Sequence, residues 1–263
     1  MLPANSPVEH HERSLRFSLR TLSLIVLGLC ILFALLKLFG DAVVNARRAS
    51  IRSCAQGPLN QLTMALQNYH DRWGQLPPAY FADEDGTPIH SWRVLVLPYV
   101  EQQKLYDQYD FAEPWNSPKN SQLANKMPRV FHSHSEPEST EFTNIVVIVG
   151  PRTAFPYSRT TRFDDFTDGP ENTILLTEIT NSKINWLEPR DLTVEEMSFS
   201  VNDRSQPSIS STHWRQPYVV FGDSIKAYAV SDELSPKTLR GLTTIAGNEP
   251  ETRAELEAKG YLK

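Results

Sequence analysis

The chain has 263 residues, which is enough for one large domain or two small ones with a real hydrophobic core. Its net charge is −5 at pH 7 and its isoelectric point is about 5.8. The sequence holds no block of Lys or Arg and no aromatic RNA-binding pattern, which argues against a nucleic-acid partner. Its two cysteines exclude a disulfide framework and a CxxC metal site.

Residues 1–20 form a polar tail, and residues 21–40 then read TLSLIVLGLCILFALLKLFG. A helix of roughly 20 apolar residues crosses about 30 Å of hydrocarbon. We therefore predict a single transmembrane helix over residues 21–39, with Lys37 reaching the interface. Two alternatives stay open: a cleaved secretory signal with a weak cleavage site at residues 43–46, and a buried helix of a soluble protein. Arg residues occur on both sides of the segment, so charge leaves its orientation undecided.

A helical spine is predicted from about residue 42 to residue 73. Its apolar stripe recurs at spacings of 3, 4, 3 and 4 residues, in Leu59, Leu62, Leu66, Tyr69 and Trp73. The Gly57-Pro58 pair is expected to break or kink the helix before this stripe. Gly74 stands where a left-handed C-terminal cap is wanted, and Pro77-Pro78 prevents continuation.

Short helices are predicted within residues 91–126, because Ser91 and Ser117 stand at helix-capping positions. From residue 142 onward, short β-branched or aromatic runs bounded by turn residues predict strands. These runs are 142–150, 172–178, 218–223 and 225–230. The last two are joined at Asp223-Ser224, which predicts an antiparallel hairpin, and the stretch 180–212 reads mainly as loop. The expected fold class is α+β, with a helix starting at Ser235 and a charged helix closing the chain.

A series of motifs resembles the bacterial domain of unknown function 1559 family. The matching stretches are LNQLTMALQNYHDRWGQLPPAY, DGTPIHSWRVLVLPYVEQQKLYDQYDFAEPWNSPKN, VVIVGPRTAF, TDGPENTILLTE and HWRQPYVVFGDS. The resemblance implies family-signature roles for His213, Asp223, His70, Asp71, Pro77, Pro78, Trp92, Pro114, Trp115, Asp168, Gly169, Asn172 and Thr173.

The resemblance implies a pilin-like protein that is not an enzyme. Its long N-terminal helix, transmembrane in the first half, would pack on an antiparallel sheet with irregular helical insertions. The implied organisation is a tail over 1–20, a membrane helix over 21–39, a pilin-like domain over 40–248 and a charged C-terminal helix over 249–263. It further implies a single-pass protein of the inner membrane with an extracytoplasmic domain. Its partners would be the membrane, through residues 21–39, and copies of itself or secretion-system and envelope proteins.

Three departures from the family pattern stand out. The stretch RFSLRTLSLIV lacks the Gly and Glu of a prepilin peptidase site, which favours an uncleaved anchor. Ser133 and His134 replace the Cys and Pro of a frequent Cys-Pro-Ser motif, so Cys54 has no partner there. The H-x(9)-D-G signature survives as His213 and Asp223, with Ser224 in place of Gly. Because Ser tolerates positive φ poorly, another hairpin turn type is expected.

The histidines carry alternative interpretations. His70-Asp71 is a candidate proton-transfer pair, but adjacent helical residues point about 100° apart, so helix termination is the preferred reading. His132 and His134 share one face of a strand, and with His90 or His213 they are candidate ligands of a metal-dependent hydrolase. Exposed loop histidines are the plainer reading of the same pattern.

Two further patterns bear on ligands. No cofactor is expected, but the carboxylate-rich stretches DFAEPWNSP and DFTDGPENT are candidate Ca²⁺ loops, against a default of turn formation. An aromatic run suits either a glycan-binding groove or the core between a helix and a sheet. The run comprises Trp73, Tyr80, Phe81, Trp92, Tyr99, Tyr106, Tyr109 and Trp115. A non-catalytic membrane-anchored assembly protein is thus the first hypothesis, an extracytoplasmic module for a polysaccharide or peptide the second, and a metal-dependent hydrolase the third.

Overall fold

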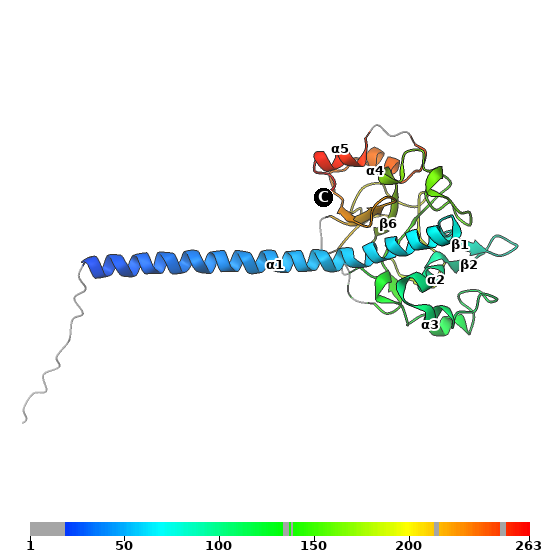
Figure 1. The fold of residues 1–263 in the computed structure, drawn as a ribbon, viewed down its shortest axis with the longest axis horizontal. Coiled ribbons are helices and arrows are strands. Elements are labelled where there is room, and N and C mark those ends of the chain that lie inside the picture. Colours follow the sequence, from blue (N-terminus) through cyan, green and yellow to red (C-terminus); the bar gives the residue numbers. More distant parts are fainter. Residues whose placement is uncertain (1–18, 134–136, 138, 213–215, 248–250) are drawn as a thin grey trace, which may run out of the picture. The chain divides into compact units, whose positions relative to one another are not determined.

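The computed structural model describes residues 19–133, 137, 139–212, 216–247 and 251–263 (Figure 1). His134 and His213, and with them the first half of the H-x(9)-D-G signature, lie outside the described residues. The chain divides into two compact units, Met1–Ser50 and Ile51–Lys263. Helix α1 (Leu19–Trp73) contributes its first part to one unit and its second part to the other.

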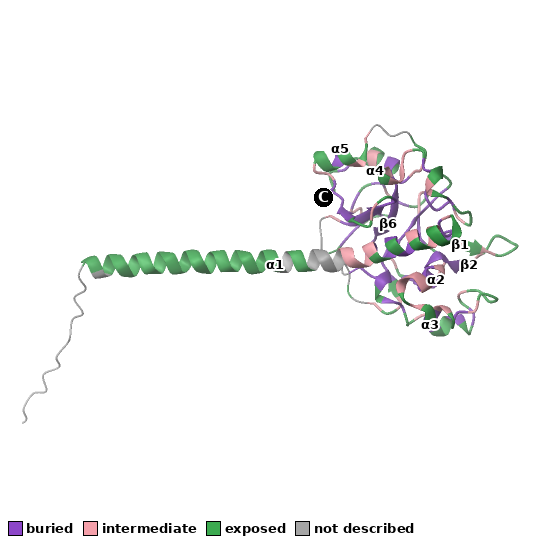
Figure 2. Ribbon diagram, viewed as in Figure 1, coloured by how far each residue is buried: buried purple, intermediate pink, exposed green. Residues whose placement is uncertain are grey.

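The first unit holds an apolar segment of α1, Leu22–Ala46, with a mean hydropathy of 2.7. Its 25 residues extend over about 38 Å of helix, which exceeds the roughly 30 Å of a bilayer core. None of the segment is buried, and its apolar side chains are exposed all round (Figure 2). It is therefore long and apolar enough to span a membrane. It ends later than the predicted 39, because Ala42, Val43 and Val44 continue the apolar run.

Of the break or kink expected at Gly57-Pro58, the break is wrong, because α1 runs through Pro58 to Trp73. Pro fits the helical φ and removes one backbone hydrogen bond. The stripe that follows packs strongly enough to keep the helix intact, since Leu59, Leu62 and Leu66 are fully buried. The predicted end is confirmed: Gly74 has φ 73° and its N–H donates to the carbonyl of His70 at 2.7 Å.

The second unit is built on a four-stranded antiparallel sheet of order β10-β9-β6-β4. These strands are β4 (Ile145–Val146), β6 (Ile174–Glu178), β9 (Tyr218–Phe221) and β10 (Ala227–Ala229). The predicted hairpin of β9 and β10 is confirmed. Neither Asp223 nor Ser224 has a positive φ, which agrees with the expected departure from an Asp-Gly turn.

Smaller pairs and short helices surround the sheet. The antiparallel pairs are β1 (Tyr80–Ala82) with β2 (Pro88–Ser91) and β3 (Phe142–Thr143) with β7 (Ile184–Asn185), and the parallel pair is β5 (Ile148–Val149) with β8 (Leu192–Thr193). The α-helices are α2 (Trp92–Leu95), α3 (Gln103–Tyr106), α4 (Pro236–Leu242) and α5 (Arg253–Ala258). The 3-10 helices are η1 (Leu97–Val100), η2 (Asn120–Leu123), η3 (Arg129–Phe131), η4 (Phe163–Asp165) and η5 (Pro170–Asn172). The predicted α+β class is confirmed.

The sheet separates two hydrophobic cores. Strand side chains alternate between its faces, as the period of two residues requires. Tyr218 and Val220 of β9 join the core that holds the leucine stripe of α1. Val219 and Phe221 join the opposite core, which contains Leu239 of α4 and Leu256 of α5. The sheet thus lies between the α1 spine and the C-terminal helices.

The outer edge of β10 is closed within the second unit. On α1, the Asn60 side-chain oxygen accepts from the Ala227 N–H at 3.1 Å, and the Gln56 amide donates to the Ala227 carbonyl at 3.4 Å. Ala229 exchanges two backbone hydrogen bonds with Lys263, at 2.9 and 3.1 Å. Open sheet edges invite pairing with other chains. Here the groups that would pair already have partners.

Candidate functional site

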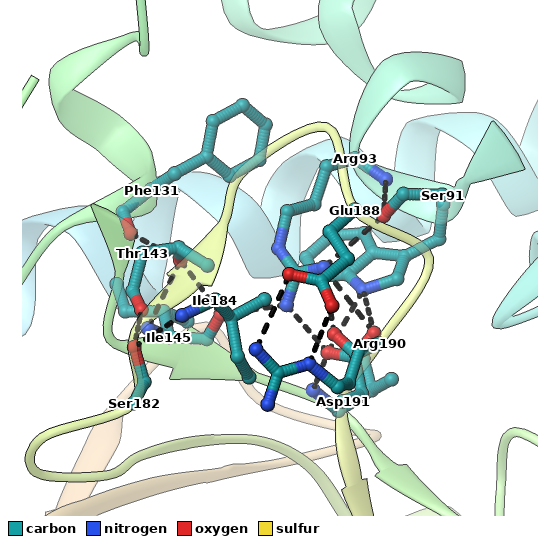
Figure 3. Close-up of polar contacts among 12 residues, drawn as sticks. Ser91, Arg93, Phe131, Thr143, Ile145, Ser182, Ile184, Glu188, Arg190 and Asp191 are labelled. Carbon is teal, nitrogen blue, oxygen red and sulfur yellow. Dashed lines mark hydrogen bonds and ion pairs between the residues drawn. The ribbon is translucent and has the colours of Figure 1, made fainter. Parts of the chain in front are cut away.

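A buried ion pair lies at the other edge of the sheet (Figure 3). Arg93 of α2 and Asp191, next to β8, are 2.5 Å apart, with side chains 0% and 1% exposed. The Trp92 indole N–H lies 3.3 and 3.2 Å from the two Asp191 oxygens, and the Val147 N–H donates at 3.0 Å. Burial raises the pKa of the Asp191 carboxyl above its ordinary value, and the Arg93 charge with these donors offsets part of that rise. The converging donors fit a carboxylate.

The pair closes the edge of β4. Arg93 also donates to the Ile145 carbonyl at 3.2 Å, and Asp191 accepts from the Val147 N–H, so the two charges occupy the places of a neighbouring strand. Because every Asp191 contact is a structural hydrogen bond, the pair fits a structural role better than proton transfer. Sequence reasoning singled out Trp92 and missed Arg93 and Asp191, although an Arg inside the apolar run WRVLVL was a usable signal.

A polar cavity of about 270 Å³ lies beside the ion pair. Arg190 and Arg204 line it, and Asp191, which is buried, lines it too. Arg190 is paired with Glu188 at 2.6 Å, whereas Arg204 donates to neutral oxygens, the Thr180 hydroxyl at 3.2 Å and the Ser211 carbonyl at 3.0 Å. The remaining lining residues are Ile179, Thr180, Asn181, Ser182, Ile184, Leu192, Glu196, Asp203, Ser205, Gln206, Pro207, Ser208 and Ser210. A cavity with these charged and polar lining residues can hold a small polar molecule.

His90 is engaged on both ring nitrogens. Its Nε2 lies 3.1 Å from the Phe111 carbonyl, which can only accept, so Nε2 carries the proton. Its Nδ1 therefore accepts from the Tyr109 hydroxyl at 2.9 Å. Burial lowers the pKa of His90, which favours this neutral form. Neither nitrogen is left for a metal.

The other histidines of the metal hypothesis are not brought together by the described structure. His132 is 8% exposed rather than an open loop residue, and His134 and His213 lie outside the described residues. Within residues 19–133, 137, 139–212, 216–247 and 251–263, no three His, Cys, Asp or Glu side chains form a group that fits a metal ion. The metal-dependent hydrolase hypothesis gains no support there.

The first candidate Ca²⁺ loop is folded around a buried amide. The Asn120 side chain donates to the carbonyls of Asp110, Glu113 and Pro114 at 2.9 to 3.0 Å. The Lys119 ammonium lies 2.7 Å from the Asp110 carboxylate and is the main cause that lowers its pKa. Four of the loop's oxygens therefore already face protein donors. Pro114 of this loop is exposed. Half-buried Trp115 anchors the loop, because its backbone N–H donates to the Ile89 carbonyl at 2.9 Å.

The second candidate Ca²⁺ loop joins the sheet to the C-terminal helices. Asp168 accepts from the Gly247 N–H at 2.5 Å, and Asn172 accepts from the Arg253 N–H at 2.8 Å. Gly169 adopts φ 86°, which favours glycine. The Thr173 hydroxyl lies 3.2 Å from the Thr244 carbonyl. These signature residues connect the start of β6 to α4 and α5.

Asp223 is the residue of the H-x(9)-D-G signature that the structure describes, and it contacts α5 at the same junction. Its two oxygens lie 2.5 and 2.8 Å from the Arg253 guanidinium, a bidentate pair. The guanidinium lies over the rings of Phe221 and Tyr228, at 5.4 and 5.3 Å. Asp168, Gly169, Asn172, Thr173 and Asp223 thus converge on the attachment of α5. Their arrangement fits a structural role.

His70 and Asp71 lie at the end of α1. The His70 ring packs on Phe163 with centroids 4.5 Å apart, and Asp71 is exposed. Pro77 and Pro78 are buried in the arm that follows, which is held by Leu76 N–H to the Thr161 carbonyl at 2.8 Å. This agrees with the interpretation of the motif as a helix end and a packed arm.

The aromatic run divides between core and surface. Trp92 and Tyr109 are buried, Trp73 and Phe81 are exposed, and the other four are half-buried, namely Tyr80, Tyr99, Tyr106 and Trp115. The buried and half-buried members agree with the core reading, whereas the glycan-binding reading stays a prediction that concerns the exposed members.

A family model described as "Protein of unknown function (DUF1559)" matches residues 45–148. The match begins in α1 and extends to β5, and it contains His70, Trp92 and Trp115. No curated protein and no solved structure matches the chain. This match over residues 45–148 agrees with the family that the sequence motifs predict.

Proposed function

We propose that the protein is a non-catalytic, membrane-anchored envelope protein that acts through assembly or protein interaction, as pilins and pseudopilins do. The observation that carries the proposal is the exposed apolar segment Leu22–Ala46, which belongs to the same helix as the leucine stripe of the core. An apolar surface exposed all round needs lipid or another protein around it. The family description assigns no activity.

The engagement of the polar groups supports a non-catalytic role. His90 and Asp191 have perturbed pKa values, which often mark catalytic sites. Here each is explained by burial and by hydrogen bonds to structural partners. Both sheet edges are closed as well, so we place assembly contacts on the anchor segment and on exposed side chains.

The first experiment determines anchoring and orientation. We expect the native protein to stay in carbonate-washed membranes as a chain starting near Met1. We also expect protease added to spheroplasts, whose inner membrane is intact, to digest the second unit from the extracytoplasmic side. A soluble product starting near residue 47 would instead establish a cleaved signal and contradict the anchor. A start within residues 14–24 would establish pilin-type processing.

Assembly is tested through Cys30, which is exposed in the apolar segment. In a Cys54→Ala background, oxidation of intact membranes should produce a disulfide-linked dimer through Cys30. The matched Cys30→Ala/Cys54→Ala variant should give none. A Cys30 chain that stays monomeric at native expression levels would contradict self-assembly through the anchor while leaving anchoring intact.

The polar cavity favours a second candidate function, an extracytoplasmic module for a small polar ligand such as a saccharide or peptide end. Arg204 has neutral partners and further N–H groups to offer. A thermal-shift screen of the full chain with saccharides and short peptides should give hits that Arg204→Ala abolishes. The exposed Arg162→Ala variant, outside the cavity, is the control. A screen without hits would remove this candidate.

A further inference from the structure

Aromatic rings contact one another at the end of α1 and in the segments that pack beside it. Tyr69 lies 6.1 Å from Trp73 and 5.9 Å from Tyr99, measured between ring centroids. The Trp73 indole N–H donates to the Tyr99 hydroxyl at 3.1 Å. Tyr106 packs against the same hydrophobic core as Tyr69 and Tyr99, and its helix α3 contacts η1, which holds Tyr99. This cluster joins α1 to η1 and α3.

A second set of ring contacts leads to the β1–β2 hairpin. Tyr106 lies 5.3 Å from Phe111, Phe111 5.4 Å from His90, and His90 6.5 Å from Phe81. We call the seven residues the aromatic strip: Tyr69, Trp73, Phe81, His90, Tyr99, Tyr106 and Phe111. Figure 1 shows its elements, the end of α1, α3 and the β1–β2 hairpin, at one end of the second unit.

Three members of the strip are exposed: Trp73 at 61%, Phe81 at 42% and Phe111 at 36%. Large aromatic side chains left in water are costly, and at interfaces they are the residues that contribute most to binding. Tyr69 and Tyr99 hold the Trp73 ring through ring contacts and the Trp73–Tyr99 hydrogen bond. Tyr106 packs on Phe111, and the buried His90 packs on Phe81. The exposed rings therefore lose little side-chain conformational entropy when a partner binds.

The strip has an acidic rim. Residues 69–115 contain eight Asp and Glu against three Lys and Arg, and Arg93 is buried in its ion pair. Seven of the acids are exposed, namely Asp71, Asp83, Glu84, Asp85, Glu101, Asp107 and Glu113. Three of them stand together at the tip of the β1–β2 hairpin. Arg72 and Lys104 are the exposed basic residues of the same stretch, so seven negative against two positive side chains leave an excess of negative charge in the segments that carry the rings.

We propose that the aromatic strip and its acidic rim form a docking surface for a basic segment of a partner protein. Cationic side chains bind over the faces of Trp, Tyr and Phe, and Arg does so more readily than Lys. The carboxylates of the rim steer such a segment and pair with the charges that do not stack. This surface deepens the proposed function, on which it rests, by giving the interaction protein a partner of stated chemistry.

Charge decides against the other occupants. A second copy of the chain in a two-fold dimer would bring one acidic rim against another, which is repulsive. A neutral glycan would stack on the rings but would gain nothing from seven exposed carboxylates. Only a basic segment uses both parts of the surface.

The test uses the full chain in nanodiscs of zwitterionic lipid. The probes are a nona-arginine, a nona-lysine and a nona-glutamate peptide, with cellohexaose as the glycan probe, and binding is measured by titration calorimetry. We expect nona-arginine to bind more tightly than nona-lysine, nona-glutamate and cellohexaose not to bind, and added salt to weaken the complex. Trp73→Ala and Phe111→Ala should each lower nona-arginine affinity by about two- to fivefold.

Two controls keep the result specific. Phe142→Ala removes another exposed aromatic, 41% exposed and outside the strip, and should leave the affinity unchanged. Glu84→Gln/Asp85→Asn alters only the exposed hairpin tip, so it tests the rim without touching the packing, and it should lower the nona-arginine affinity and its dependence on salt.

Several outcomes overturn the inference. Equal affinity in the wild type, Trp73→Ala and Phe111→Ala would mean attraction by net charge alone. Cellohexaose binding that Trp73→Ala removes would establish a glycan surface instead. Absence of binding by all four probes would also overturn it. In that case the protein could still fractionate with membranes and crosslink through Cys30, so the proposed function would stand.

Discussion

The two edges of the central sheet are closed by different chemistry. At β10, neutral amides of α1 and the backbone of Lys263 take the free hydrogen-bonding groups. At β4, a fully buried Arg93–Asp191 pair does so. A hydrogen-bonded neutral amide costs far less to bury than a charge, whose burial is tolerated only with its partner in place. The sheet thus closes one edge with neutral groups and the other with a charge pair that depends on both of its members.

The largest expected effect comes from breaking the charged edge. Asp191→Ala leaves the Arg93 guanidinium buried and unpaired, and should lower the free energy of unfolding by about 3–5 kcal/mol. Arg93→Met/Asp191→Leu removes both charges and should lose much less. Urea denaturation of the two variants measures the difference. Equal losses would mean that the pair acts through shape alone.

Removal of residues 262–263 opens the neutral edge. The change deletes both hydrogen bonds of Ala229 and the side chain of Leu262, which is 2% exposed. We expect a loss of about 2–4 kcal/mol, from an apolar side chain and two net hydrogen bonds. Faster hydrogen exchange at Ala229 than at Val147 would locate the opening. Unchanged exchange at Ala229 would show that water replaces the lost partner fully.

Asn60→Ala removes the side-chain acceptor that the Ala227 N–H uses. The buried N–H then lacks its partner, which costs about 1–3 kcal/mol. Gln56→Ala should cost less, because its bond of 3.4 Å is long. Thermal melts of both variants give the order. A larger effect for Gln56→Ala would reverse our ranking of the two contacts.

Mild acid provides the smallest and most local effect. The folded-state pKa of His90 is lowered, so its neutral form contributes stability that is present above the ordinary value of about 6.5 and is lost as the pH falls below it. NMR titration of His90, with hydrogen exchange at both edges, should show loosening around Tyr109 before either edge opens. His90→Gln should abolish that step. Simultaneous opening of the edges would mean that His90 is coupled to the whole sheet.

Local patterns predicted local structure well. The leucine stripe, the cap at Gly74, the N-caps at Ser91 and Ser235 and the β9–β10 hairpin all follow from spacing or from one residue's backbone preference. The error at Pro58 arose because tertiary packing of the following stripe outweighed a local preference.

Long-range contacts were beyond the sequence pattern. Arg93 and Asp191 are 98 residues apart, and Asn60 and Ala227 are 167 apart. No periodicity joins such positions, so the ion pair and the cavity beside it emerged only from the fold. The sequence indicates the aromatic run. It does not predict which of its side chains are buried in the core and which are exposed in the strip, because that depends on the tertiary fold.

The pairing of Ala229 with Lys263 also sets an order of events during biosynthesis. The apolar segment Leu22–Ala46 is synthesised long before residue 263. The two hydrogen bonds that Ala229 exchanges with Lys263 cannot form until residue 263 has been made. Closure of the β10 edge is therefore a late step in the folding of the second unit during synthesis.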